Sequence, residues 1–289
     1  MSNFRNYVSN TSDKIGNFLN SGSIVANIAF LFLVIIIFII LLRVGVNIIS
    51  WLFAPSGSVH LIDGMIDAKH SQHFPQDPND KDAVSIIRSK NQMHGIEFTW
   101  SVWINIEDLQ YHSSNYKHIF HKGGDKINYS DTSSGATGLN QGTNGPGLYI
   151  MPDKNDLLVV MDTFNKGQEK IQIPNIPLNK WINVMIRCEN LTIDVYVNGT
   201  ISQRRKCKEV PYQNYGDVYT TSNGGFSGYL SNLWYWNHAL APTTIQNIVR
   251  NGPSLSLKHK NHNQPKDNEP AYFSLRWFFT NNDPDYGGL

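Results

Sequence analysis

Residues 96–106 read IEFTWSVWINI, and this stretch decides the fold. Apolar side chains occupy its even-numbered positions, with polar residues such as Glu97 and Thr99 between them. Because successive side chains of a strand point to opposite faces, the alternation predicts a strand with one face in a core and the other largely polar. Such strands are typical of antiparallel sheets, so we predict a mainly β domain.

Short segments of the same kind surround this strand. Residues 192–197 and 200–207 form a predicted hairpin, because Asn198-Gly199 between them is a strong signal for a tight turn. Closely spaced short strands indicate an antiparallel β-sandwich of the jelly-roll kind, which we place at residues 57–253 with one short helix at 242–249. Further strands are expected at 58–68, 116–121, 147–151, 157–163, 170–173 and 181–188, a strand pair at 225–237, and a loop at 71–82.

A long apolar run precedes the domain. Residues 24–42 read IVANIAFLFLVIIIFIILL and carry no charge. A helix of this length covers about 28 Å, close to the thickness of a bilayer's hydrocarbon core, so we predict one transmembrane helix. Residues 44–53 either continue that helix or lie in the membrane interface, which places the anchoring segment at 24–53. The residues expected to contact the bilayer are Ile24, Phe30, Ile36, Leu42, Arg43 near the headgroups and Trp51 in the aromatic belt.

The two ends of the chain are polar. Residues 1–23 are expected to lie outside the bilayer as a polar segment, and a cleaved signal peptide is disfavoured because the leading region is long and barely basic. The basic residues on the two sides of the span balance, so they leave the orientation open. Residues 254–289 are expected to form a linker and a tail strand at 271–279, which joins an edge of the same domain or a partner's sheet.

Charge and cysteine content limit the functional classes. The 24 basic and 23 acidic residues give a net charge of +1, so no binding to nucleic acid is expected. The two cysteines, Cys188 and Cys207, lie on strands that flank residues 192–197. Two strand spacings amount to about 9.5 Å, which exceeds the reach of a disulfide unless the sheet end curls. A Cys188–Cys207 bridge and two free thiols both remain open.

Residues 123–147 form a long polar segment that is expected to be a functional or mobile loop. Its oxygen-bearing side chains offer a calcium site as the one candidate cofactor, and a solvated loop is the simpler interpretation. The calcium candidates are Asp125, Asn128, Asp131 and Asn140. His118 and His121 are expected on opposite faces of a strand, which argues against a shared metal.

The C-terminal half carries motifs specific enough to suggest a family. They are Trp181 at the start of a strand, DVYVNG at 194–199, GFSGYLSNL at 225–233, and the approach to the short helix at 239–242. Over residues 58–253 the chain resembles the laminin-G-like branch of the concanavalin A-like lectin/glucanase superfamily. The resemblance implies a concanavalin A-like sandwich.

A narrower resemblance rests on NYGDVY, NGGFSGYLSNL and the tail AYFSLRWFF. These motifs resemble membrane-anchored laminin-G-like proteins of nucleocytoplasmic large DNA viruses. That resemblance implies a non-enzymatic minor capsid protein in the virion's inner membrane, with the lipid bilayer and capsid or other virion proteins as partners.

The superfamily also includes enzymes and lectins. Glycosidases of the superfamily carry Glu-x-Asp-x-x-Glu on one strand, and none of the six glutamates here begins that pattern, so no enzyme is expected. The alternative is a membrane-anchored lectin or adhesin that binds glycans by stacking on Tyr229, Trp234 or Trp236. For these three aromatics we expect packing into the core instead, as is usual for aromatic residues in strands.

Overall fold

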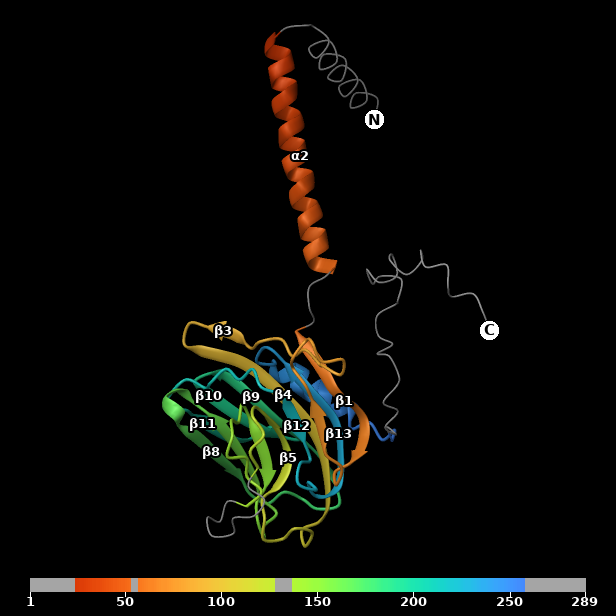
Figure 1. The fold of residues 1–289 in the computed structure, drawn as a ribbon, viewed down its shortest axis with the longest axis vertical. Coiled ribbons are helices and arrows are strands. Elements are labelled where there is room, and N and C mark those ends of the chain that lie inside the picture. The colour runs from red at the N-terminus through yellow and green to blue at the C-terminus, as the bar shows by residue number, and fades with distance from the viewer. Residues whose placement is uncertain (1–23, 53–56, 128–136, 258–289) are drawn as a thin grey trace, which may run out of the picture. The chain divides into compact units, whose positions relative to one another are not determined.

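The structure is a computed structural model that describes residues 24–52, 57–127 and 137–257. The chain divides between Ser56 and Gly57 into two compact units, and each is described by itself. Figure 1 shows the helix of the first unit and the layered strands of the second. The predictions for residues 1–23 and for the tail strand at 271–279 fall outside the described residues.

The described residues of the first unit form one continuous helix, α2 (Ile24–Leu52). Of the two alternatives for the second apolar stretch, the structure thus shows a continuation of the first helix. Its segment from Asn27 to Ser50 is long and apolar enough to cross a membrane. Arg43 lies inside this segment, where a long side chain can extend along the helix toward the headgroups. The prediction for Trp51 falls on a side chain outside the described part of the structure.

The second unit is a sandwich of two antiparallel sheets (Figure 1). The strands of the larger sheet are β1 (Ser58–Asp67), β3 (Lys90–Gln92), β4 (Gly95–Asp108), β9 (Trp181–Asn190), β10 (Thr192–Val197), β11 (Thr200–Lys206) and β13 (Ser227–Trp236). Those of the smaller sheet are β2 (Gln72–Phe74), β5 (Lys117–Lys122), β6 (Gly147–Ile150), β7 (Leu157–Asp162), β8 (Gln168–Ile173) and β12 (Val218–Thr220).

The strand orders confirm the predicted sandwich. The larger sheet runs β1-β13-β4-β9-β10-β11, with β3 on β4, and the smaller runs β2-β12-β5-β6-β7-β8. The even-numbered residues of β4 from Ile96 to Ile106 lie in the core between the sheets, as their alternation predicted. Trp100, at its centre, is 1% exposed and contacts the rings of Phe120 and Tyr235 at 5.2 and 4.9 Å between centroids. Burial of such large side chains is the main favourable term for the domain.

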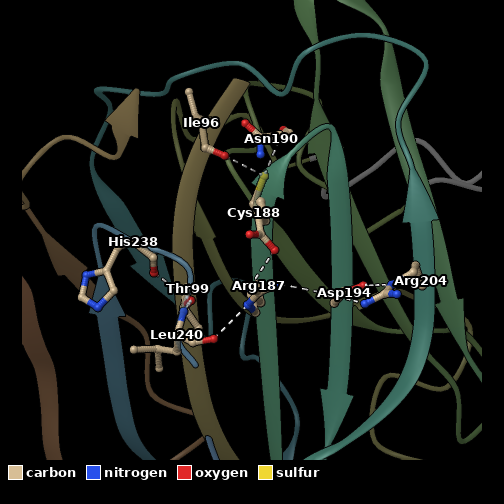
Figure 2. Close-up of polar contacts among 10 residues, drawn as sticks. Ile96, Thr99, Arg187, Cys188, Asn190, Asp194, Arg204, His238 and Leu240 are labelled. Carbon is tan, nitrogen blue, oxygen red and sulfur yellow. Dashed lines mark hydrogen bonds and ion pairs between the residues drawn. The ribbon is translucent and has the colours of Figure 1, made fainter. Parts of the chain in front are cut away.

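The opposite face of β4 is polar, as expected, but it is buried by the helix α3 (Pro242–Asn251) and the segment before it. The Thr99 hydroxyl donates to the His238 carbonyl at 2.9 Å and accepts from the Leu240 amide at 3.0 Å (Figure 2). A second apolar cluster forms here from Met185, Tyr196, Leu240 and Ile245. Thr99 therefore stays satisfied inside a core that the strand pattern alone does not reveal.

An ion-pair network ties β9, β10 and β11 together beside this cluster (Figure 2). The Asp194 carboxylate, 1% exposed, accepts from Arg204 at 2.6 and 2.9 Å and from Arg187 at 3.3 Å. Arg187 also donates to the Leu240 carbonyl at 2.9 Å, so the network reaches the segment that leads into α3. Two guanidinium groups thus compensate one buried carboxylate.

The prediction of a strand pair at residues 225–237 was wrong, because these residues form the single strand β13. The turn lies earlier, where Gly225 adopts a φ of 48°. Within β13, Asn232 has a φ of 49° at a register shift in the pairing with β4, which the strand absorbs as a bulge rather than a turn. The short strands β2, β3 and β12 were not predicted, since three residues are too few to show a period.

Candidate functional site

The three aromatics proposed for ligand stacking lie on the outer face of the larger sheet. Leu230, Leu233 and Tyr235 of β13 belong to the core, whereas Tyr229, Trp234 and Trp236 are half-buried on the opposite side. The expectation that these three pack into the core was therefore wrong for Tyr229 and Trp234, whereas Trp236 packs against the smaller apolar cluster of Met185, Tyr196, Leu240 and Ile245. Strand alternation is the reason, because the core already takes the residues between them.

The outward position does not leave Trp234 open to a ligand. Its ring stacks on His60 at 3.9 Å between centroids on one side and on Trp236 at 5.5 Å on the other, with planes 12° and 15° apart. Trp236 in turn packs against the cluster under α3. A small groove of about 200 Å³ runs beside Trp234 and Trp236. His60, Trp234 and Trp236 thus form one aromatic column. Because sugar stacking needs an uncovered ring face, we interpret this column as packing that holds α3 on the sheet.

Of the four calcium candidates, the structure describes Asp125 and Asn140. Asn128 and Asp131 fall outside the described residues, and the described chain holds no cluster of three His, Cys, Asp or Glu side chains arranged for a metal. The Asn140 side-chain oxygen Oδ1 accepts from the backbone amides of Lys126 and Gly142, at 2.8 and 3.0 Å. Asn140 therefore closes the base of the loop.

Both cysteines are buried free thiols. The Cys188 thiol lies 3.6 Å from the Ile96 carbonyl, to which it donates (Figure 2). Burial raises the pKa of Cys188 far above its usual range and that of Cys207 to about 11. Both are therefore protonated and poorly nucleophilic at neutral pH.

The expectation for His118 and His121 was wrong, because their rings meet. His118 Nε2 lies 2.8 Å from His121 Nδ1, and a bulge in β5 between His118 and Phe120 turns the two side chains to the same face. His118 Nδ1 accepts from the Ser222 amide at 2.9 Å, so its Nε2 carries the proton and donates to His121. Burial lowers the pKa of His118 well below its usual value and that of His121 to about 4.

A cleft of about 1020 Å³ opens where the short helix η1 (Phe164–Lys166) joins β7 to β8. No sequence motif pointed to it. The turn forms one wall and residues 141–143 of the long loop form another. The segment around Tyr212 follows the turn, because the Phe164 amide donates to the Val210 carbonyl at 3.0 Å and the Tyr212 amide to the Asp162 carbonyl at 2.8 Å.

Two exposed aromatic rings line this cleft. Phe164 is 52% and Tyr212 44% exposed, and the rings meet edge to face with centroids 5.5 Å apart and planes at 70°. Large aromatic residues are usually covered in a folded domain, so two that remain open in one hollow mark a candidate binding surface. The edge-to-face contact fixes each ring and leaves ring surface available to a ligand.

The polar floor of the cleft is held in place from below. Asp162 accepts from the Gln168 side chain at 3.0 Å and from the Asn144 amide at 2.7 Å. Burial raises the pKa of Asp162, although both hydrogen bonds act in the opposite direction. Asn144 also accepts from the buried Tyr149 hydroxyl at 2.6 Å, which connects the floor to the sheet. The floor is therefore preorganised rather than formed by a ligand.

The remaining polar groups suit a neutral, hydroxyl-rich ligand. Asn165, Gln168 and Gln141 bring side-chain amides, each of which offers both a donor and an acceptor, and Lys126 adds a cation. Convergent amides around an apolar ring surface match the alternating C–H and O–H faces of a sugar. The sequence signal that could have found the cleft is the position of Phe164 and Tyr212, both in polar turns outside any alternating strand.

The sandwich with its open aromatic cleft defines a lectin-like β-sandwich domain. A family profile described as "Concanavalin A-like lectin/glucanases superfamily", of the laminin-G type, matches residues 78–246, and the chain belongs to this superfamily. That match confirms the predicted laminin-G-like, concanavalin A-like domain. No curated protein sequence matches the chain.

Solved structures with a similar arrangement include botulinum neurotoxin binding domains. The serotype G domain has 11% identity and a TM-score of 0.44, covering 67% of this chain and 46% of that one. The receptor-binding domain of neurotoxin D has 12% identity and a TM-score of 0.43, covering 66% and 52%. A serotype D domain solved with N-acetylneuraminic acid has 12% identity and a TM-score of 0.42, covering 67% and 51%. This chain thus spans about half the length of these three proteins.

Proposed function

We propose that the chain is a membrane-anchored glycan-binding protein whose sandwich holds a sugar in the cleft at Phe164 and Tyr212. The pair of exposed rings over a preorganised floor of amides carries this proposal. Sugar C–H faces would pack on the rings, and the amides of Gln168 and Asn165 would exchange hydrogen bonds with hydroxyls. Membership in a superfamily of lectins and glucanases supports it.

The anchor is the second part of the proposal. Helix α2 would hold the sandwich at a bilayer, since its 24-residue segment from Asn27 to Ser50 meets the length and composition of a span. Anchoring raises the effective concentration of a weak binding site at a surface, so modest affinity for a single glycan suffices for adhesion.

We also propose that the domain is not an enzyme. Hydrolysis of a glycosidic bond needs two carboxyl groups that face the scissile bond, one of them free to transfer a proton. In the cleft, both oxygens of Asp162 already accept hydrogen bonds, from Asn144 and Gln168. Asp162 therefore suits positioning of the floor better than acid catalysis.

A screen against immobilised glycans tests the binding function. The full-length chain in a detergent without a sugar headgroup should retain a restricted group of glycans, and the same preparation of a Phe164→Ala, Tyr212→Ala variant should lose them. Equal retention by both proteins, or retention of no glycan by either, would show that the cleft has no such function.

The minor capsid role stays a prediction from the resemblance to virion proteins. The described residues contain no feature that identifies a capsid partner. Fractionation of purified virus particles tests it: a virion component resists salt and is released by detergent, whereas a cell-surface lectin is absent from the particles.

A further inference from the structure

A second, smaller pocket lies beside the proposed glycan cleft. Its volume is about 330 Å³, at the lower end of the range of about 300–1,000 Å³ for small-molecule sites. Tyr212 lines the cleft, and the next three residues, Gln213, Asn214 and Tyr215, line this pocket. The two hollows therefore share one chain segment as a wall.

The pocket is assembled from three parts of the sequence. Lys122 comes from the end of β5, Gln213 to Tyr215 from the segment before β12, and Arg88 from the stretch before β3. Gln76 holds that stretch in place, because its side-chain carbonyl accepts from the Ile86 amide at 2.9 Å. This hydrogen bond fixes the wall that carries Arg88.

The charge in the pocket has one sign. Of the described residues that line it, Lys122 and Arg88 are charged and both are cations. Lys122 is 6% exposed, and within the described chain its ammonium group makes one hydrogen bond, to the Gly216 carbonyl at 2.7 Å. An ammonium group has three donors, so a buried lysine with one acceptor has capacity for an anionic partner.

The carboxylate of Asp217 offsets the positive charge of Lys122 only in part. Asp217 lies outside the pocket lining and is occupied by two other donors, His73 Nε2 and the Gln76 amide, each at 2.8 Å. Arg88 is exposed and forms no ion pair with any residue in the described part of the chain. The pocket thus keeps an excess of positive charge.

One residue of the pocket lining, Gln213, carries an unused acceptor. The Gln213 side-chain oxygen is buried and has no hydrogen-bond partner among the described residues. A buried acceptor without a donor costs free energy, which a ligand hydroxyl would recover. A ligand that suits the pocket carries an anionic group for the cations and a hydroxyl for Gln213.

We propose that this pocket binds an acidic sugar unit, with Lys122 and Arg88 on its carboxylate and Gln213 accepting from one of its hydroxyls. The proposal rests on the glycan-binding function, because it takes the neighbouring cleft to hold the rest of the same glycan. It narrows the ligand class to saccharides that carry a carboxylate.

The ionisation of Lys122 gives the proposal a pH dependence. Burial lowers the pKa of Lys122 to about 8, and the opposing effect of Asp217 is smaller. A bound carboxylate favours the charged ammonium, so binding takes up a proton above pH 8. The groups that face Lys122 are Asp217 with its partner His73, and Arg88 across the pocket.

Calorimetric titration with D-glucuronate and D-glucose tests the pocket, because the two sugars differ in the carboxylate. The full-length chain is used in a detergent without a sugar headgroup, at constant ionic strength. Glucuronate should bind at least about tenfold more tightly than glucose, as one charge-assisted contact provides. Its affinity should fall about tenfold between pH 7 and pH 9 as Lys122 loses its proton.

Variants separate the pocket from the cleft. Arg88→Gln should weaken glucuronate binding about tenfold, and Lys122→Gln should also remove the pH dependence. Lys81→Gln is the matched control, since Lys81 is exposed on the same stretch and does not line the pocket. If Lys122→Gln does not fold, the Arg88→Gln variant and the pH series on the unmodified chain still test the acidic-sugar pocket.

The outcomes are distinct for the two proposals. Equal binding of glucuronate and glucose, or glucuronate binding that ignores both pH and Arg88→Gln, overturns the acidic-sugar pocket. Oligosaccharides that bind through Phe164, with an affinity that a terminal glucuronate does not raise and Arg88→Gln does not lower, overturn it as well and leave the glycan cleft in place. Glucuronate binding that passes every test, with no oligosaccharide bound at Phe164, supports the pocket and removes the proposed function of the cleft.

Discussion

Phe164 and Tyr212 lie far apart in the sequence, yet their rings meet edge to face with centroids 5.5 Å apart. The backbone brings them together, because residues 210–212 follow the turn that carries Phe164. Both rings are about half exposed and stand over a floor fixed by Asp162 and Asn144. An aromatic pair so placed contributes little to the core and much to a surface that can bind a ligand.

The first prediction concerns stability at this pair. Phe164→Ala should change the free energy of unfolding by no more than about 0.5–1 kcal/mol, because an exposed ring loses little buried area. Urea unfolding followed by tryptophan fluorescence measures it, with Phe120→Ala as the buried comparison at about 3–5 kcal/mol. A loss for Phe164→Ala as large as that for Phe120→Ala would show that the ring is structural.

The second prediction concerns the aromatic column on the other sheet. Trp234→Ala removes the ring between His60 and Trp236, so it should lower the free energy of unfolding by about 2–4 kcal/mol. Glycan binding at the cleft should stay within about twofold of the unmodified chain. Loss of glycan binding in a folded Trp234→Ala variant would instead place the ligand on this column.

The third prediction concerns the buried carboxylate of Asp194. Asp194→Ala leaves Arg187, whose side chain is 14% exposed, without its buried partner, which should cost about 3 kcal/mol of the free energy of unfolding. Glu189→Ala is the control, because Glu189 pairs with Arg187 from a side chain that is 47% exposed. That change should cost at most about 1 kcal/mol. Similar costs for both variants would contradict the central role of Asp194.

The fourth prediction is a loss of stability in acid. Burial holds the pKa of His121 at about 4 in the folded chain, against about 6.5 when unfolded. Below pH 6.5 the unfolded state therefore binds more protons, and stability present above pH 6.5 is lost toward pH 4. His121 alone should account for about 2 kcal/mol between pH 6.5 and pH 5. Asp162, whose pKa is raised, acts in the opposite sense.

Thermal unfolding at pH 7.5, 6.5 and 5 measures this effect in the unmodified chain and in His121→Gln. At pH 7.5 the variant should unfold at a lower temperature than the unmodified chain, because His118 loses its acceptor. Its unfolding temperature should then fall less steeply as the pH is lowered. Parallel pH profiles for the two proteins would mean that His121 does not carry the acid sensitivity.

The fifth prediction concerns the anchor. Replacement of residues 24–52 by a soluble linker should release the chain from membranes, because no other described helix is long and apolar enough to span one. The sandwich should remain folded, since the three apolar clusters of the described residues lie within residues 57–257. Membrane flotation and circular dichroism report the two results. A chain that stays on membranes, or fails to fold, would contradict this division.

The sandwich could be predicted because its evidence is local. The alternation in β4, the Asn198-Gly199 turn and the apolar run of α2 each depend on residues close in sequence. The error at β13 has the same origin, since glycines at 224 and 225 and a polar Asn232 look like turns when the register is unknown. Periodicity identifies a strand but not its partner.

The candidate site could not be predicted, because it depends on contacts between distant segments. Phe164 faces Tyr212 only after residues 210–212 fold along the turn, and His118 reaches His121 only through a bulge that breaks the period of two. Trp234 and Trp236 are the opposite case. Their residue types made them candidates for ligand stacking, but the two rings stack on each other and cover the ring face that a ligand would need.

The most direct test of the central claim is the dissociation constant of a glycan selected in the screen. It should be measured for three proteins: the unmodified chain, the cleft variant that carries both Phe164→Ala and Tyr212→Ala, and Trp234→Ala as the folded control. Binding that weakens at least about tenfold in the cleft variant and stays unchanged in the control is the predicted result. Binding that survives loss of both cleft rings would contradict the assignment of the site.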